Sequence, residues 1–225
     1  FGAGSGEMAY NFLKKCNAKD LPRNYFIIEK NENLIKKQKN KLQKIPKNLF
    51  EKINWVDNSD VSENVFIIAN EILDAIPSKI FYKEDNKFYE KCIIEEEGNL
   101  VFSLKDCNGD YLKEIHSIED RLNRKLPNSY TFEINMRIES FLLNIFKNSK
   151  NFLLMIIDYG YHEDEFFHPQ RKNGTVQFYK NHKKINDIFS FQQGSFDISI
   201  SVNFSNIYRI AKRNSIEIYS FTTQS

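Results

Sequence analysis

Short apolar runs and amphipathic stretches alternate along the first third of the chain. Residues 24–30 (NYFIIEK), 49–57 (LFEKINWVD) and 64–70 (NVFIIAN) are apolar runs that end in a polar residue, a pattern typical of buried strands. Residues 6–18 and 32–42 place apolar side chains at helical spacing instead. This succession of helices and uninterrupted apolar strands favours an α/β fold with a parallel, doubly wound sheet.

The pattern changes in the middle of the chain. Residues 78–104 alternate between apolar and polar positions, with Asp-Asn and Gly-Asn turn signals, which predicts an antiparallel β-meander inserted into the α/β frame. Residues 151–161 (NFLLMIIDYGY) are the most apolar stretch and predict a central strand. The remaining expected elements are helices at 111–122, 135–147 and 206–213 and strands at 174–179, 196–202 and 215–221. Without an internal repeat or a long linker, we expect a single domain over residues 1–225.

Composition and charge exclude several function classes. Of 225 residues, 32 are basic and 30 acidic, so the formal net charge of +2 gives no electrostatic reason to expect a nucleic-acid partner. The basic run at residues 36–47 (KKQKNKLQKIPK) is expected to be a solvated helix face and loop. Three widely spaced cysteines without a Cys-x-x-Cys pair favour a reducing compartment. No apolar run approaches the roughly 18 residues that a membrane span requires.

The chain opens on a glycine-rich segment, FGAGSGEMAYNFLKK, in which a helical pattern follows the glycines. Such a loop typically holds a nucleotide or phosphate at a helix N-terminus. Gly2-x-Gly4-x-Gly6 fits the loop of adenosylmethionine-dependent methyltransferases, whereas Gly4-x-Gly6-x-x-Ala9 also satisfies the dinucleotide fingerprint. Glu29 follows the last glycine by 23 positions, where an acid can accept both hydroxyls of a ribose in either case. The glycine spacing alone therefore leaves the cofactor open.

Further polar side chains stand at the ends of the other predicted strands. They are Trp55, Asp57, Asn70, Glu71, Asp74 and Asp158. Because ligands of open α/β sheets bind beyond the carboxyl ends of the strands, we expect these groups to converge with the glycine loop on one edge of one sheet.

The sequence shows no clear motif for other kinds of active site. A group of His and acidic residues, namely His162, Glu163, Asp164, His168 and His182, has a spacing that matches no structural zinc pattern, so no metal is expected. The sequence also contains neither a Gly-x-Ser-x-Gly elbow nor a Walker loop.

Seven blocks taken together resemble the MidA/NDUFAF7 family of class I methyltransferases. In chain order the first six are GAGSGEMAYNFL, YFIIEKNENLIKKQ, NWVD, IIANEILDAIP, FEINMRIESFL and LLMIIDYGY, and the seventh is the downstream series His182, Gly194, Asp197, Val202, Phe204, Thr223 and Gln224. The fourth is the most specific, through Asn70, Glu71 and Asp74, and the fifth is similar to a family helix start at Glu133. Asn203 departs from the family, which usually has an acid at that position.

The resemblance implies a Rossmann-like fold and a specific chemistry. It implies S-adenosyl-L-methionine as cofactor and methylation of an arginine in a protein, of the kind found in a respiratory complex I subunit. The expected cofactor-binding residues are Gly2, Gly4, Gly6, Glu29, Trp55, Asp57 and Asn70, with Glu29 on the ribose and Asp57 on the adenine amino group. The expected catalytic residues are Glu71, Asp74, Asp158 and His182, because carboxylates can grip a guanidinium and accept its proton.

The resemblance also implies that the chain is cut at both ends. The family has a first strand before the glycine loop and continues beyond the Thr-Gln pair near residue 224. Residues 78–130 and 161–195 are expected to be insertions on the substrate side. The implied location is cytoplasmic in a bacterium or the mitochondrial matrix in a eukaryote. The sequence leaves open a homodimer, a methyltransferase with another acceptor, a non-catalytic assembly factor and, more remotely, an NAD-dependent oxidoreductase.

Overall fold

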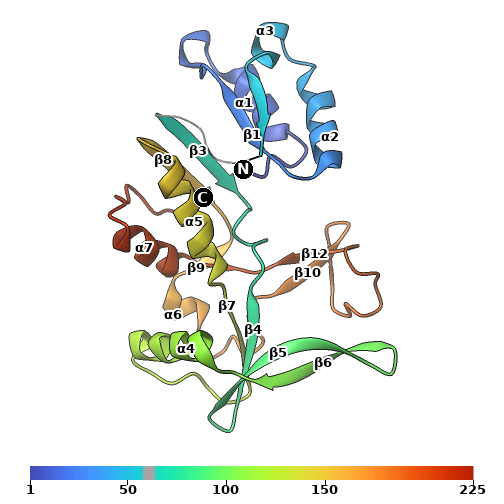
Figure 1. The fold of residues 1–225 in the computed structure, drawn as a ribbon, viewed down its shortest axis with the longest axis vertical. Coiled ribbons are helices and arrows are strands. Elements are labelled where there is room, and N and C mark those ends of the chain that lie inside the picture. The colour runs from blue at the N-terminus through green and yellow to red at the C-terminus, as the bar shows by residue number, and fades with distance from the viewer. Residues whose placement is uncertain (58–63, 225) are drawn as a thin grey trace. The chain divides into compact units, whose positions relative to one another are not determined.

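The computed structural model describes residues 1–57 and 64–224 (Figure 1). The chain divides into two compact units. The first unit comprises Phe1–Ile72 and Leu142–Ile157, and the second comprises Leu73–Phe141 and Asp158–Ser225. Among the described residues, no helix combines the length and the apolar character that a membrane crossing requires.

The first unit contains parallel strands and the helices between them. Its elements are α1 (Glu7–Lys15), a 3₁₀ turn (Ala18–Asp20), β1 (Tyr25–Ile28), α2 (Glu32–Leu42), α3 (Lys47–Phe50), β2 (Ile53–Val56), β3 (Val65–Asn70) and β8 (Phe152–Ile157). Strand β1 pairs with β2, and β3 pairs with β8, both in parallel. The mixed α/β class is therefore confirmed. The arrangement is less extended than the predicted doubly wound sheet, since the strands form separate two-stranded sheets.

The first two residues connect to both of these sheets. The backbone nitrogen of Phe1 donates to the carbonyl oxygen of Ile68 in β3 at 3.0 Å. The backbone nitrogen of Gly2 donates to the carbonyl oxygen of Ile28 at the end of β1 at 3.4 Å. The glycine loop that follows therefore starts between β1 and β3.

Helix α2 has the predicted bounds because local signals agree with its packing. Asn31 caps it, with its Oδ1 accepting from the backbone nitrogens of Asn33 at 2.9 Å and Leu34 at 3.3 Å. The apolar stripe of α2 then packs on α1, β1 and β2. The buried core of this unit consists of Ala9, Leu13, Ile27, Leu42, Ile45 and Ile53.

The second unit is mainly antiparallel. Its elements are β4 (Lys79–Glu84), β5 (Lys87–Glu96), β6 (Asn99–Asp106), α4 (Gly109–Leu122), β7 (Tyr130–Ile134), the start of α5 (Arg137–Asn148), β9 (Gly160–Tyr161), α6 (Glu163–Phe166), β10 (Gln177–Lys180), β11 (Lys183–Ile185), β12 (Asp197–Ser199), β13 (Val202–Asn203) and α7 (Phe204–Arg213). The sheets have the orders β6-β5-β4-β7 and β11-β10-β12, and β9 pairs in parallel with β13.

The predicted meander is confirmed as β4, β5 and β6 (Figure 1). Asp85 and Asn86 form its first turn, both with positive φ, as a tight hairpin requires. The second turn is Glu97-Gly98 and not the predicted Gly-Asn, so it lies one residue earlier. Glycine at the second turn position supplies the positive φ at the least cost.

Two sequence predictions for this unit were wrong. Glu133 does not start a helix, because it lies in β7, which pairs with β4 and is covered by an aromatic core. That core includes Phe81, Tyr130, Phe132 and Phe167. Residues 215–221 do not form the predicted last strand. The two large side chains there, Tyr219 and Phe221, are exposed, so the apolar pattern of this segment has no sheet to cover.

Candidate active site

The glycine loop adopts a conformation that favours glycine at three positions. Gly2, Gly4 and Gly6 all have positive φ, at 58°, 52° and 83°. A Cβ on Gly2 would lie 2.0 Å from the Ile72 side chain, whereas a Cβ on Gly4 would meet no atom within 4 Å. The loop is thus packed at one end against Ile72, two residues beyond β3, and is open at Gly4. An open backbone of this kind allows close approach of a ligand.

Gln38 joins three of the predicted cofactor-binding residues. Its Nε2 donates to the carbonyl oxygen of Gly4 at 2.9 Å and to Oε2 of Glu29 at 3.3 Å. Its Oε1 accepts from the indole nitrogen of Trp55 at 2.9 Å. Gln38 is fully buried, so this one amide fixes the loop, the β1 end and the β2 end relative to one another. A polar residue on the apolar stripe of α2, between Leu34 and Leu42, was the sequence signal for this role.

Glu29 follows β1 directly, and its carboxylate is partly committed to the backbone. Oε1 accepts from the nitrogens of Lys30 at 2.9 Å and Asn31 at 3.0 Å, so the side chain is held over the start of the turn into α2. Such a carboxylate can accept from the hydroxyls of a ribose. The open glycine loop and this acid, both tied to Gln38, fit a nucleoside cofactor.

Two other predicted cofactor-binding residues lie at strand ends of the same unit. Asn70 ends β3 opposite Ile157 of β8, and its carbonyl oxygen is 4.0 Å from the position that a Cβ on Gly2 would occupy. Asp57 is exposed, one residue beyond the end of β2. The structure thus brings Asn70 close to the glycine loop. For Asp57 it shows only that the residue directly follows β2.

Asp158 and Asp74 form a carboxylate pair in the second unit. Oδ2 of Asp158 accepts from the backbone nitrogens of Leu73 at 2.9 Å and Asp74 at 3.3 Å, and its Oδ1 accepts from that of Tyr159 at 2.9 Å. Oδ2 of Asp74 accepts from Ser199 Oγ at 2.7 Å. Oδ1 of Asp74 is buried and has no hydrogen-bond partner among the described residues. Because buried carboxylate oxygens are normally hydrogen-bonded, this oxygen is suited to accept from a donor on a ligand.

The environment of Asp158 makes it a stronger base than an ordinary aspartate. Burial and the charge of Asp74 raise the pKa of Asp158 from 3.8 to about 6, against the opposing effect of its backbone hydrogen bonds. A carboxylate with such a pKa is ionised near neutral pH and still takes up a proton readily.

Glu71 has an unusual backbone conformation. It is exposed, with φ at 50°, in the left-handed region that a side chain other than glycine rarely adopts. Its backbone nitrogen donates to the carbonyl oxygen of Ile157 at 2.8 Å, which extends the pairing of β3 with β8. Backbone outliers of this kind concentrate at functional sites.

His182 lies away from the carboxylate pair. It sits with Asn181 at the exposed tip of the hairpin between β10 and β11, where both residues have positive φ. Ser199, which contacts Asp74, pairs with Gln177 at the opposite end of β10. Gln177 and Lys180 are the two ends of β10, about 10 Å apart in extended chain, and His182 lies beyond Lys180 in the turn. The structure therefore does not bring His182 to Asp74 or Asp158.

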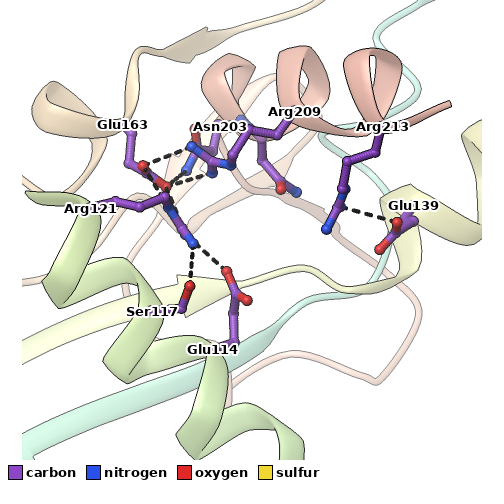
Figure 2. Close-up of polar contacts among 9 residues, drawn as sticks. Glu114, Ser117, Arg121, Glu139, Glu163, Asn203, Arg209 and Arg213 are labelled. Carbon is purple, nitrogen blue, oxygen red and sulfur yellow. Dashed lines mark hydrogen bonds and ion pairs between the residues drawn. The ribbon is translucent and has the colours of Figure 1, made fainter. Parts of the chain in front are cut away.

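Asn203, which departs from the family pattern, contacts a carboxylate from elsewhere in the chain (Figure 2). Its Oδ1 caps α7 by accepting from the nitrogen of Asn206 at 3.2 Å, and its Nδ2 donates to Glu163 at 3.4 Å. Glu163 also accepts from Arg209 at 2.6 and 2.8 Å and from Arg121 at 3.1 Å. A buried negative charge thus stands beside Asn203 and joins α4, α6 and α7.

The ion pairs of Glu163 outweigh the cost of burying it. Burial acts to raise the pKa of Glu163, but the hydrogen bonds and charges of Arg121 and Arg209 hold that pKa below its usual value. A cavity of about 50 Å³ lies against this cluster and is also lined by Leu73 and Glu133. Burial raises the pKa of the Glu133 carboxyl, although Thr175 and Val176 donate hydrogen bonds to it. Because the cavity has room for only a few water molecules, this cluster is a structural link rather than a substrate pocket.

Metal ligands do not gather anywhere in residues 1–57 and 64–224. No three His, Cys, Asp or Glu side chains in these ranges are close enough to hold an ion together.

Comparison with protein-family models gives a match over almost the whole chain. Residues 1–222 match the family described as "Putative S-adenosyl-L-methionine-dependent methyltransferase". A search of the curated proteins gave no match.

Two solved structures from Burkholderia thailandensis have similar folds. One is a protein described as a "likely methyl transferase" and solved with S-adenosyl-homocysteine bound, with a TM-score of 0.84 and 24% identity over 95% of this chain. The other is an uncharacterized protein of the same superfamily, with a TM-score of 0.82 and 25% identity over 95% of this chain. The present chain covers 54% and 56% of those two chains, so it spans little more than half of their length. A similarity at this level of identity establishes a shared fold.

Proposed function

The chain belongs to the S-adenosyl-L-methionine-dependent methyltransferase family whose model it matches, and from this premise we propose that it binds that cofactor and methylates a nitrogen acceptor. The favoured acceptor is an arginine side chain in a protein substrate. The sequence resemblance implies that this substrate is a respiratory complex I subunit. The observation that carries the acceptor class is the buried, unpartnered Oδ1 of Asp74 beside Asp158.

The first unit supplies the groups that would hold the cofactor. The open backbone at Gly4 would lie along it, and the Glu29 carboxylate would accept from the ribose hydroxyls. Gln38 would keep these two groups at a fixed separation, since it hydrogen-bonds to both. The bound cofactor supplies a methyl group on a positively charged sulfur, which is open to attack by a nucleophile.

Asp74 and Asp158 are the groups that would act on the acceptor. A protonated guanidinium has five N–H donors and no free lone pair, so it must be held by acceptors and lose a proton. Asp74 would accept one N–H through its free Oδ1, and the pair would favour a cation over a neutral group. Asp158, with its pKa raised to about 6, would take the proton as the nitrogen is methylated.

Of the predicted catalytic residues, the proposal keeps Glu71 and excludes His182. Glu71 stays a candidate for gripping the acceptor, since it directly follows Asn70 in a strained conformation. His182 is left out, because it lies at the exposed tip of a hairpin.

A methyl-transfer assay tests the proposal. The protein is incubated with adenosylmethionine carrying a tritiated methyl group and with bacterial lysate proteins, and the labelled amino acid is identified after hydrolysis. We expect labelled methylarginine, and a loss of at least about a hundredfold in rate for Asp158→Asn, as for removal of a general base. Asp110→Asn, an exposed carboxylate on α4 that pairs with Lys113, is the matched control and should retain activity.

Two outcomes would replace the proposal. Label on another amino acid or on a small molecule would support methyltransferase activity but assign it to a different acceptor. Cofactor binding without transfer to any acceptor would favour a non-catalytic assembly factor.

A further inference from the structure

Helices α1 and α2 form an open groove lined by lysines. The groove has a volume of about 580 Å³, and its lining includes Lys37, Lys41, Lys44, Tyr10 and Asn40. The lysines belong to the basic run of residues 36–47, which the sequence alone suggested was only a solvated surface. From this groove we infer a docking site for an acidic, extended segment of a partner protein.

The charge of the groove is concentrated and positive. Three lysines line it against a single acid, Glu7, which pairs with Lys41. No Asp or Glu occurs anywhere between residues 33 and 50. The groove therefore carries as large a net positive charge as the whole chain, which has +2. The attraction is local to this surface and not a property of the molecule as a whole.

The lysines have a spacing that suits an extended peptide. Lys37 and Lys41 are one turn apart on α2, about 6 Å along the helix axis, and Lys44 follows the helix. Side chains on one face of an extended segment recur about every 7 Å. Two acidic residues separated by one residue could thus reach Lys37 and Lys41 together, with a third reaching Lys44.

Neutral donors complete the lining. Asn40 is exposed beside Lys37 and Lys41, where its amide can donate to a carboxylate or a peptide carbonyl. Tyr10 forms the wall on the α1 side, with the ammonium groups of Lys14 and Lys41 lying 5.4 and 5.8 Å from its ring centre. Of these two lysines Lys41 lines the groove, and the ring keeps its ammonium group at the edge.

The same features disfavour a nucleic acid or a membrane as the occupant. The Tyr10 ring is flanked by two lysines, so it is not a free platform on which a base could stack. Among the described residues, no arginine lines the groove to grip a phosphate bidentately. A groove also matches a narrow protruding chain better than a lipid surface, which binds apolar side chains as well as charge.

A fluorescence-anisotropy titration tests the inference. The probe is a labelled decapeptide of alternating Glu and Ser, and its matched peptide has Gln in place of Glu. We expect the Glu peptide alone to bind at 50 mM salt and to weaken as salt rises, because screening shortens the range of charge interactions. The double substitution Lys37→Glu/Lys44→Glu should weaken binding by about tenfold or more, as expected when two attractive charges become repulsive.

A charge-matched variant separates the groove from the general basic character of the region. Lys36→Glu/Lys47→Glu makes the same change of charge at two exposed residues that do not line the groove, and should change the affinity by less than about threefold. Equal losses in both variants, or no binding of the Glu peptide, would overturn the inference. So would tighter binding of oligo(dT) or of phosphatidylserine vesicles that is lost in the groove variant. Thermal unfolding of both variants verifies that they fold, and the outcome does not depend on whether the protein transfers methyl groups.

Discussion

The amide nitrogen of Gln38 donates a hydrogen bond to the carbonyl oxygen of Gly4, 2.9 Å away, and so ties the middle of α2 to the glycine loop. The two residues are 34 positions apart in the sequence. Gly6, the residue before α1, provides no side-chain cap, so the Gln38 amide is the side chain that holds the middle of the loop. Gln38 therefore acts on the proposed cofactor site by positioning the loop.

We predict that Gln38→Leu weakens S-adenosylhomocysteine binding by about tenfold or more. The leucine keeps the volume but leaves the Gly4 carbonyl and the Trp55 indole without their partner, and each such loss costs about 1–3 kcal/mol. Isothermal titration calorimetry measures the affinity, with the exposed Gln43→Leu at the end of α2 as control. Unchanged affinity in Gln38→Leu would remove this residue from the site.

The pH dependence of methyl transfer should follow the ionisation of Asp158. As the proposed base it must be ionised, so kcat/KM should rise with pH and level off above the pKa of about 6. Part of the raised pKa comes from the charge of Asp74. Asp74→Asn should therefore move the rising limb to lower pH, apart from any loss in rate. If the pH at which kcat/KM rises is the same in this variant, a group other than Asp158 is being titrated.

Folding stability should depend on Asp158 in the acid range. Its pKa in the folded state, about 6, is higher than the value near 3.9 of an unfolded chain. The folded state therefore binds the proton more tightly, and ionisation lowers the unfolding free energy as pH rises from about 4 to 6. Asp158→Asn should remove this loss of unfolding free energy. The loss is at most about 2 kcal/mol after allowance for the partial solvent exposure of Asp158.

Urea unfolding of both proteins at several pH values tests this expectation. The stability of Asp158→Asn relative to the original protein should increase between pH 4 and 7. Taking the difference between the two proteins cancels the titration of Glu133, whose pKa is also raised. A difference that does not vary with pH would contradict the raised pKa of Asp158.

Gly160→Ala should destabilise the segment that follows Asp158. A Cβ at this position would lie 2.2 Å from the carbonyl oxygen of Val202 and 2.7 Å from the ring of Phe204. Because the nearer atom belongs to the backbone of β13, the strands β9 and β13 would have to separate, at a cost of about 1–3 kcal/mol. The control is the unaltered protein, because Gly98 and the other glycines with open surroundings have a positive φ at which alanine is itself strained. A melting temperature equal to that of the control would show that the pairing adapts without strain.

The sequence predicted those parts of the fold in which local signals and packing agree. Helix α2 has a capping residue, an apolar stripe and a following proline, and its bounds are as predicted. The meander was predicted from its alternation, although its second turn falls one residue earlier. Strand β7 was missed because its residues, Tyr130–Ile134, are buried by contacts with β4 and an aromatic core that are distant in sequence. Residues 215–221 have strand-like composition but no partner strand in the described structure.

The candidate site was only partly predictable for the same reason. Strand-end acids such as Glu29 and Asp158 follow from the periodicity of apolar runs, since a polar residue ends each run. The link through Gln38 depends on three segments meeting in space, and its one local signal is a glutamine on an apolar stripe. The position of His182 depends on the register of a hairpin, which the sequence did not specify.

The central claim is that the glycine loop and Glu29 hold S-adenosyl-L-methionine. The most direct test is isothermal titration calorimetry of the protein and of Glu29→Ala with S-adenosylhomocysteine, adenosylmethionine and NAD. The account predicts that both adenosyl compounds bind, that NAD does not, and that Glu29→Ala weakens binding by about tenfold or more, as for loss of hydrogen bonds to a charged group. Binding of NAD without either adenosyl compound would contradict it, as would adenosyl binding that is unaffected by Glu29→Ala.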